Sequence, residues 1–315
     1  MARRKNRKTN VKRSYGQSFV PKEGENDKEG YEDIYDYALT EADQFPENML
    51  KYWRQRKQLF TLFDGTSANG QLPLLDQESW YSITPEPIAA RIAERCRCST
   101  ILDAFCGVGG NAIQFALTCE NVIAIDIDPI KLQMAKHNAK VYGVEQYITF
   151  LQGDWRDFVN AWMRERDTNA LETDKQSDDA KWQKCQKLNF DVVFLSPPWG
   201  GVSYRSLHPE TPQKQQVISA IPATPTIDTE KDENFYPLSA LAPSGGKDLF
   251  QQASQLTPNV CMFVPRTIDL NELASLVGQH SQIAVEEQWL RGRCKALSCY
   301  FGELAEWKED QVNSE

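Results

Sequence analysis

The feature that most constrains the fold is a repeated alternation of short apolar runs with helical patterns. Between residues 84 and 152, runs rich in Val and Ile are separated by segments whose apolar residues recur at helical spacing. This alternation indicates a doubly wound, mostly parallel sheet, because each parallel connection needs a helical crossover. Runs that are apolar throughout are typical of strands buried on both faces. The expected strands are residues 101–105, 121–126, 148–152, 190–196 and 259–264, and the expected helices are residues 86–96, 112–119, 129–142 and 270–277.

Two later apolar stretches, residues 282–289 and 296–302, resemble paired strands that close a sheet edge. We therefore predict an α/β chain of Rossmann-like architecture, with a doubly wound, mostly parallel sheet and an antiparallel edge. Thr84 is the expected N-cap of the first helix of this domain, with Pro85 as its first helical residue. Ahead of the sheet, helical spacing between residues 31 and 63 predicts a small helical segment.

Composition divides the chain into four parts. Residues 1–30 are polar and charged and are expected to be disordered. The helical segment occupies residues 31–75, the main domain residues 76–305 and an acidic tail residues 306–315. Two inserts interrupt the main domain, near residues 164–187 and 203–246. The second insert predicts a long loop, which fits either a functional lid or padding.

Charge is distributed unevenly along the chain. The net charge is −9, yet the first thirteen residues contain seven basic residues and no acid. This basic arm fits three uses: contact with nucleic acid, a nuclear address, or a solubilising tail. No stretch approaches the roughly 20 apolar residues that a membrane-spanning helix needs, so we expect no membrane partner.

The eight cysteines and three histidines argue against a metal site. No two cysteines form a Cys-x-x-Cys pair, and His137, His208 and His280 lie far apart in the sequence. We therefore expect no bound metal. Several cysteines lie in apolar runs, as buried reduced thiols do, which indicates a reducing compartment.

A glycine-rich turn follows the first strand of the predicted sheet. Asp103 ends the strand, and Gly107, Gly109 and Gly110 lead into the next helix. There the backbone can turn tightly, and unpaired N–H groups can meet a ligand. The glycine spacing matches a dinucleotide fingerprint poorly, which disfavours NAD. Asp103 suits instead the cationic amino group of S-adenosylmethionine.

The next two strands also lead into acids. Asp126 ends the second strand, about 20 residues after the glycines, where an acid accepts hydrogen bonds from ribose hydroxyls. Asp128 is expected to cap the helix that begins at Pro129. Asp154 and Trp155 follow the third strand and would meet the amino group and the ring face of adenine. Each feature alone is compatible with a plain turn or cap, but three acidic strand ends in order favour S-adenosylmethionine.

The fourth strand ends at Ser196-Pro197-Pro198-Trp199. This turn resembles the (Asn/Asp/Ser)-Pro-Pro-aromatic motif of amino-methyltransferases. Two prolines would hold Ser196 and the nearby carbonyl groups rigidly, as acceptors for the hydrogens of an exocyclic amine. Trp199 would offer a stacking face that favours a cationic base. The alternative is a plain strand-to-loop turn in which Trp199 belongs to the core.

Together these motifs resemble the trimethylguanosine synthase family. The resemblance runs from about residue 48 to residue 302 and departs in the two inserts; it includes KYWRQR from Lys51, WYSITPE from Trp80, DAFCGVGGN from Asp103 and LSPPWGG from Leu195. It implies S-adenosylmethionine-dependent methylation of the exocyclic N2 of 7-methylguanosine caps, giving trimethylguanosine caps on small nuclear and nucleolar RNAs. It also implies a monomer that acts on capped RNA, with ribonucleoprotein proteins as further partners, in the nucleus, the nucleolus and in part the cytoplasm.

The resemblance also implies a role for each matching residue. The cofactor would be held by Asp103, Asp126 and Asp154 with the Gly107–Gly110 loop, and covered by Phe60 and Thr84. Ser196, Pro197 and Pro198 would face N2, and Trp199 would stack on 7-methylguanine. The cap phosphates would meet Lys51, Tyr204, Arg266 and Lys295.

Two alternatives stay open. The first is another RNA amino-methyltransferase, such as an N6-adenine enzyme, in which Asn or Asp is usual at the position of Ser196. The second is a non-catalytic cap-binding protein on the same scaffold, which would need neither the intact glycine loop nor all three acids.

Overall fold

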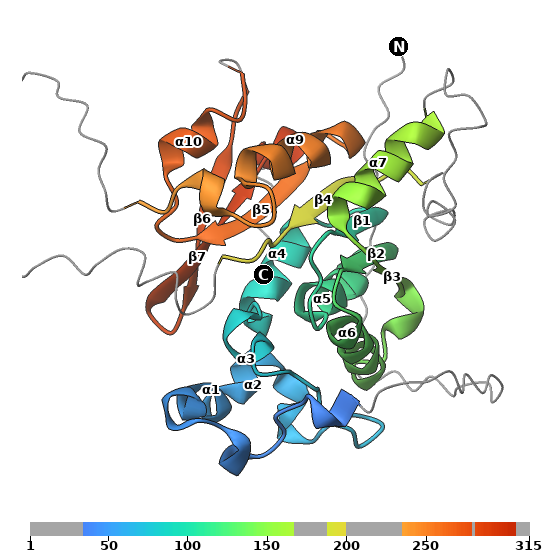
Figure 1. Cartoon of the computed structure of the whole chain (residues 1–315), viewed down its shortest axis with the longest axis vertical. Helices are drawn as coiled ribbons and strands as arrows, with labels where there is room; N and C mark the ends of the chain where they lie inside the picture. The colour runs from blue at the N-terminus through green and yellow to red at the C-terminus, as the bar shows by residue number, and fades with distance from the viewer. Residues whose placement is uncertain (1–33, 167–187, 200–234, 279–280, 307–315) are drawn as a thin grey trace, which may run out of the picture.

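The computed structural model describes residues 34–166, 188–199, 235–278 and 281–306 (Figure 1). At its centre lies a seven-stranded sheet with the order β3-β2-β1-β4-β5-β7-β6. Neighbouring strands from β3 to β5 are parallel, whereas β7 is antiparallel to both β5 and β6. The strands are β1 (Thr100–Asp103), β2 (Asn121–Asp126), β3 (Ile148–Gln152), β4 (Val192–Leu195), β5 (Val260–Pro265), β6 (Ala284–Leu290) and β7 (Arg293–Tyr300). The predicted doubly wound sheet with an antiparallel edge is confirmed.

Helices cover both faces of the sheet. One face carries α4 (Glu86–Arg95), α5 (Gly110–Thr118) and α6 (Pro129–Val141), and the other carries α7 (Trp155–Arg166), α9 (Gly246–Leu256) and α10 (Leu270–Ala274). Successive strand residues point to opposite faces, so Ile101 joins the first apolar cluster and Leu102 the second. Burial on both faces explains why the strands read as continuous apolar runs.

Residues 34–83 form a helical segment that belongs to the first apolar cluster. Its aromatic residues Phe45, Trp53, Phe63 and Trp80 pack on one another, and Trp80 is fully buried. The predicted helical segment is confirmed, but as short pieces rather than long helices. These are η1 (Ile34–Asp36), η2 (Ala42–Gln44), η3 (Glu47–Met49), α1 (Leu50–Arg54), α2 (Arg56–Leu59), η4 (Thr61–Asp64) and α3 (Ser79–Ser82).

Helix starts test the capping predictions. Asp128 accepts hydrogen bonds from the backbone N–H groups of Ile130 and Lys131, so its predicted capping of α6 is confirmed. The prediction that Thr84 caps α4 is wrong, because the N-cap is Pro85. The hydroxyl oxygen of Thr84 instead accepts a hydrogen bond from Asn111 Nδ2 at 3.1 Å.

Two helices, α7 and α9, lie largely in stretches to which the sequence analysis assigns no element. Residues 235–246, expected within a long loop, pack against the second face of the sheet. Tyr236, Leu238 and Leu241 are buried there around η9 (Leu238–Ala240). The end of the second insert therefore contributes to the core. The first insert after Arg166, residues 200–202 and residues 203–234 of the second insert lie outside the described residues, as do both chain ends.

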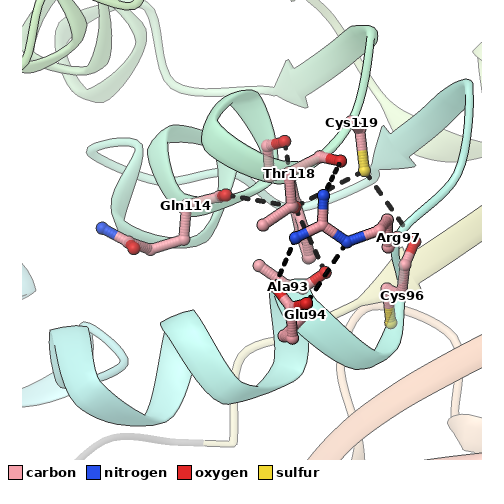
Figure 2. A network of polar contacts seen from close by, with 8 residues as sticks. Ala93, Glu94, Cys96, Arg97, Gln114, Thr118 and Cys119 are labelled. Atoms are coloured by element: carbon pink, nitrogen blue, oxygen red, sulfur yellow. Dashed lines mark hydrogen bonds and ion pairs between the residues drawn. The ribbon is translucent and has the colours of Figure 1, made fainter. Parts of the chain in front are cut away.

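At the amino end of β1, a polar network joins the end of α4 to the end of α5 (Figure 2). Arg97 donates to the Thr118 carbonyl oxygen at 3.3 Å and to Glu94 Oε2 at 2.5 Å, and the Thr118 hydroxyl donates to the Ala93 carbonyl oxygen at 3.2 Å. Seven cysteines lie in the described part of the chain; none of them forms a disulfide there, and six are buried. The described residues contain no helix with the length and apolar character needed to cross a membrane.

Candidate active site

The carboxyl ends of four neighbouring strands bring the predicted acids and the diproline turn to one edge of the sheet. In spatial order, Asp154 follows β3, Asp126 ends β2, Asp103 ends β1 and Ser196 follows β4. Asp103 is level with Phe194 of β4, and the N–H of Gly153 donates to the carbonyl oxygen of Asp126 at 2.9 Å. Strand order reverses between β1 and β4, which is where open α/β sheets bind ligands.

The turn between β1 and α5 requires its glycines. Gly107 and Gly109 have φ values of 51° and 90°, in the left-handed region, and Gly109 is the N-cap of α5. A Cβ atom at Gly110 would lie 2.9 Å from Ile83 Cγ1. The backbone thus approaches its neighbours closely, and the first N–H groups of α5 remain without intrahelical partners.

Asn138 of α6 connects this glycine loop to the N-terminal segment. Its side chain is fully buried, and Nδ2 donates to the carbonyl oxygens of Val108 and Leu74, both at 2.9 Å. Its Oδ1 accepts from the N–H of Leu74 at 2.7 Å. Sequence reasoning missed Asn138, although a polar residue on the apolar face of α6 was a readable signal.

Asp103 is a buried carboxyl group without a partner. It is 0% exposed, and neither carboxylate oxygen makes a hydrogen bond within the described residues. Burial raises the pKa of Asp103 to about 8, the nearby backbone N–H of Phe105 lowers it in part, and the charge of Asp126 raises it further. A buried acid of this kind at a sheet edge is typical of a functional site.

The side chains of Asp126 and Asp154 both accept hydrogen bonds from backbone N–H groups. Asp126 accepts from the N–H of Gly107 at 2.7 Å and from that of Asp128 at 2.9 Å, and burial is the main cause that raises its pKa. Asp154 accepts from the N–H of Arg156 at 2.8 Å and therefore caps the start of α7. Their roles toward ribose and adenine stay predictions.

Trp155 does not present its ring to a ligand. Its side chain is 2% exposed and stacks on Phe158, with ring centroids 6.1 Å apart and an interplanar angle of 22°. The expectation that Trp155 meets the face of adenine is therefore wrong. The start of α7 turns this side chain into the second apolar cluster.

The diproline turn is held by residues from the end of the second insert. The carbonyl oxygen of Pro198 accepts from the N–H of Ala242 at 3.3 Å, and that of Trp199 accepts from the Tyr236 hydroxyl at 3.3 Å. Pro197 is buried, Pro198 is exposed, and Ser196 and Trp199 are half-buried.

The indole of Trp199 lies between the core and the surface. It packs against Phe263 of β5, with ring centroids 5.3 Å apart, and it contacts both apolar clusters. Its Nε1 is buried and has no hydrogen-bond partner among the described residues. Packing thus fixes the ring, but the residue as a whole is half-buried, so Trp199 is not wholly a core residue.

The two residues expected to cover the cofactor come from the N-terminal side. Thr84 is buried and, through Asn111, contacts the start of α5. Phe60 is 1% exposed and packs on Tyr142, with ring centroids 5.6 Å apart. Beside it, Glu86 accepts hydrogen bonds from the N–H of Thr61 and from the Tyr142 hydroxyl, both at 2.6 Å.

Three of the four residues expected at the cap phosphates are exposed. They are Lys51 on α1, Arg266 directly after β5 and Lys295 on β7. Pro265 pairs with Ala296, so the backbone positions of Arg266 and Lys295 lie close together. Tyr204 lies outside the described residues.

The described residues contain no cluster of three or more potential metal ligands.

Comparisons with known proteins agree with this geometry. The sequence profile of the RNA cap guanine-N2 methyltransferase family matches residues 98–210 and 210–304. Trimethylguanosine synthase of Schizosaccharomyces pombe is 34% identical over 261 residues, covering 81% of this chain and 87% of that protein. The Saccharomyces cerevisiae trimethylguanosine synthase is 30% identical over 264 residues, covering 81% and 68%. A Porphyromonas gingivalis W83 protein assigned as a methyltransferase shares the fold, with a TM-score of 0.50 and 11% identity over 86% of this chain and 56% of that one.

Fold and site together define a Rossmann-like methyltransferase. The chain belongs to the RNA cap guanine-N2 methyltransferase family, and it is an enzyme that methylates the cap guanine at N2. The predictions of fold, family and enzyme class are confirmed.

Proposed function

We propose that this enzyme uses S-adenosylmethionine to methylate N2 of 7-methylguanosine caps, giving trimethylguanosine caps on small nuclear and nucleolar RNAs. The observation that carries the proposal is the unpartnered carboxyl group of Asp103, one strand away from the diproline turn. In this proposal, a cation acceptor and a platform for a flat base would lie on adjacent strand ends. This arrangement suits a cationic cofactor placed beside a purine.

The residues at the glycine loop fit the cofactor. Asp103 offers a buried negative charge for its amino group, and the loop from Gly107 to Gly110 lets the backbone come close. Asp126 and Asp154 would contact ribose and adenine, and Phe60 and Thr84 would cover the ligand. When bound, S-adenosylmethionine supplies an electrophilic methyl group on its sulfonium.

On the substrate side, the residues position the base. An exocyclic amine is a poor nucleophile, because its lone pair is delocalised into the ring. Ser196 and the carbonyl groups of Pro197 and Pro198 would accept its hydrogens, which favours the geometry that exposes the lone pair. Trp199 would stack on 7-methylguanine and gain from its positive charge, worth about 0.5–2 kcal/mol.

Positioning carries most of the rate in this proposal. Stacking on Trp199 would bring N2 to within roughly 3–3.5 Å of the methyl group, a near-attack distance. Methylation at N7 draws electron density from the ring and acidifies N1–H, so the displaced proton can leave to solvent. Adding two methyl groups would require the demethylated cofactor to leave between rounds.

The proposal extends to partners and location. The family resemblance implies a monomer that acts on the capped end of RNA. Lys51, Tyr204, Arg266 and Lys295 would meet the cap phosphates. Small nuclear and nucleolar substrates would place the enzyme in the nucleus and nucleolus, and in part in the cytoplasm, with ribonucleoprotein proteins nearby.

Incubation of the protein with labelled methyl donor and three substrates tests the proposal. The substrates are m7GpppG, GpppG and an adenine-containing RNA, with mass analysis of each product. We expect the enzyme to add two methyl groups to m7GpppG and none to GpppG or to the adenine-containing RNA. Methylation of adenine would point to another RNA amino-methyltransferase, and cap binding without turnover would point to a non-catalytic cap-binding protein.

A further inference from the structure

We propose that the enzyme also binds the RNA chain beyond the cap, on a basic surface formed by the β6–β7 hairpin turn and the α1–α2 segment. We define this basic surface by Arg54, Lys57, Arg291 and Arg293, all of which are exposed. Its ligand would be the phosphates of the first nucleotides after the cap. The inference rests on the proposed function, because it needs a capped RNA as substrate.

The hairpin turn holds an arginine in an unfavourable backbone conformation. Arg291 and Gly292 connect the paired residues Leu290 and Arg293, with φ values of 51° and 70°. In the described part of the chain, Arg291 is the one non-glycine residue with positive φ. Such turns prefer Asn-Gly or Gly-Gly, and a left-handed conformation costs other residues roughly 1–2 kcal/mol. Strain of this kind often marks a functional position.

A side-chain contact joins the hairpin turn to the helical segment. The side-chain amide of Gln58 on α2 lies 3.1 and 3.2 Å from the two Nη atoms of Arg291; assigning the amide oxygen to this side makes it the acceptor of both. Figure 1 shows the β6–β7 hairpin reaching toward α1 and α2. Lys57 directly precedes Gln58 and Arg54 lies four positions before it, so two elements far apart in the chain contribute charge to one place.

The charges of the basic surface are not neutralised by ion pairs. None of its four residues takes part in an ion pair within the described residues, whereas Arg95 and Arg97 each pair with a glutamate. Lys57 lies near Asp64, but that carboxylate accepts hydrogen bonds from Thr66 at 2.6 and 2.9 Å. In a chain of net charge −9, such a surface fits a polyanion.

The basic surface lies on the site side of the sheet. Since β7 is antiparallel to β5 and Pro265 pairs with Ala296, the start of β7 extends past the carboxyl end of β5. Trp199 packs on Phe263 of that same strand. The residues proposed for the cap phosphates, Arg266 and Lys295, lie at this end of β5 and β7 as well. An RNA chain leaving the cap triphosphate would therefore cross the hairpin turn.

Two variants remove charge while preserving the backbone. Asn tolerates the left-handed conformation, so Arg291→Asn should leave the turn intact, and Arg293→Gln keeps a long polar side chain on β7. Each is assayed on m7GpppG and on an m7G-capped 20-nucleotide RNA. We expect KM for the capped RNA to rise roughly 3- to 10-fold, with kcat and the dinucleotide kinetics within about twofold. The slope of log KM against log salt should fall by about 0.7 for each phosphate that the variant no longer binds.

A matched control is Lys140→Gln, which removes one exposed positive charge at the far end of α6. It should change neither substrate's kinetics. Equal losses on dinucleotide and capped RNA would assign Arg291 and Arg293 to the cap itself and overturn the inference. Unchanged KM for capped RNA in both variants would also overturn it. Failure of the wild-type protein to methylate m7GpppG would instead contradict the proposed function.

Discussion

The hydroxyl of Tyr236 lies 3.3 Å from the carbonyl oxygen of Trp199 and 3.0 Å from that of Ala240, and its hydrogen serves these two acceptors. The backbone of Tyr236 also pairs with the stretch after β5, donating to Thr267 at 2.6 Å and accepting from Asp269 at 3.0 Å. One residue thus links the diproline turn to the segment that carries Arg266.

Tyr236→Phe should therefore loosen the diproline turn without leaving a cavity in the core, because the ring is kept. Loss of one such hydrogen bond typically lowers the free energy of unfolding by about 1 kcal/mol. We expect KM for m7GpppG to rise several-fold, while calorimetric affinity for S-adenosylhomocysteine stays unchanged. A parallel loss of cofactor affinity would show that Tyr236 supports the whole sheet edge.

Trp199→Ala should abolish cap methylation while sparing cofactor binding, because Trp199 and Asp103 follow different strands. Trp199→Phe keeps an aromatic face with a weaker cation–π interaction, so a partial loss of roughly 3- to 30-fold in kcat/KM is expected. Equilibrium binding of S-adenosylhomocysteine separates the two functions. If the Ala variant lost both activities while remaining folded, this division of roles would be contradicted.

Asp103→Asn should lower the affinity for the cofactor and raise the stability of the protein at high pH. The pKa of Asp103 is about 8 in the folded protein against an ordinary 3.8, so the folded state holds a proton that the unfolded chain releases. Wild-type stability therefore falls as pH rises between these two values, and the variant should lack that fall. At pH 9 we expect the variant to be more stable by a few kcal/mol in denaturant titrations.

The same pKa predicts how cofactor binding depends on pH. The cationic amino group of S-adenosylhomocysteine needs the ionised form of Asp103, so wild-type affinity should rise up to tenfold per pH unit between pH 6 and 8. Binding should release protons, seen as calorimetric heats that vary with the buffer. A pH-independent affinity for the wild-type protein would refute the assignment of Asp103 to the amino group.

Asn138→Asp should weaken the glycine loop. In the wild-type protein, Asn138 Nδ2 donates hydrogen bonds to the carbonyl oxygens of Val108 and Leu74. The substitution keeps the shape of the side chain but replaces this donor with an oxygen. A buried polar group left unpaired costs about 1–3 kcal/mol, so thermal stability should fall. Because Val108 lies between two loop glycines, KM for the cofactor should rise more than KM for the cap. Equal changes in both would indicate general destabilisation only.

The sheet and its functional edge were predictable, because apolar runs and strand-end acids are local signals. The alignment of Asp103, Asp126 and Asp154 follows from parallel pairing, which brings the carboxyl ends of the strands to one edge. The strand order does not follow from the crossovers and comes from the structure. The roles that depend on packing were less visible. Trp155 read as an adenine platform, but the start of α7 directs it into the core.

Long-range polar contacts could not be read from the sequence. Tyr236 lies in the second insert, a stretch with weak periodicity, and its partner Trp199 is 37 residues away in the sequence. The Asn138–Leu74 pair spans 64 positions, and neither residue belongs to a recognisable motif. Such contacts depend on how the helices and strands pack in the tertiary structure, so they leave no regular pattern along the chain.

The family profile begins at residue 98, yet the apolar cluster on the α4–α6 face draws on residues from Ala38 onward. Trp80, Leu74 and Leu75 are almost fully buried in that cluster. A fragment that begins at residue 98 would therefore expose a broad apolar surface on α5 and α6. We expect such a fragment to aggregate rather than to act as a smaller enzyme.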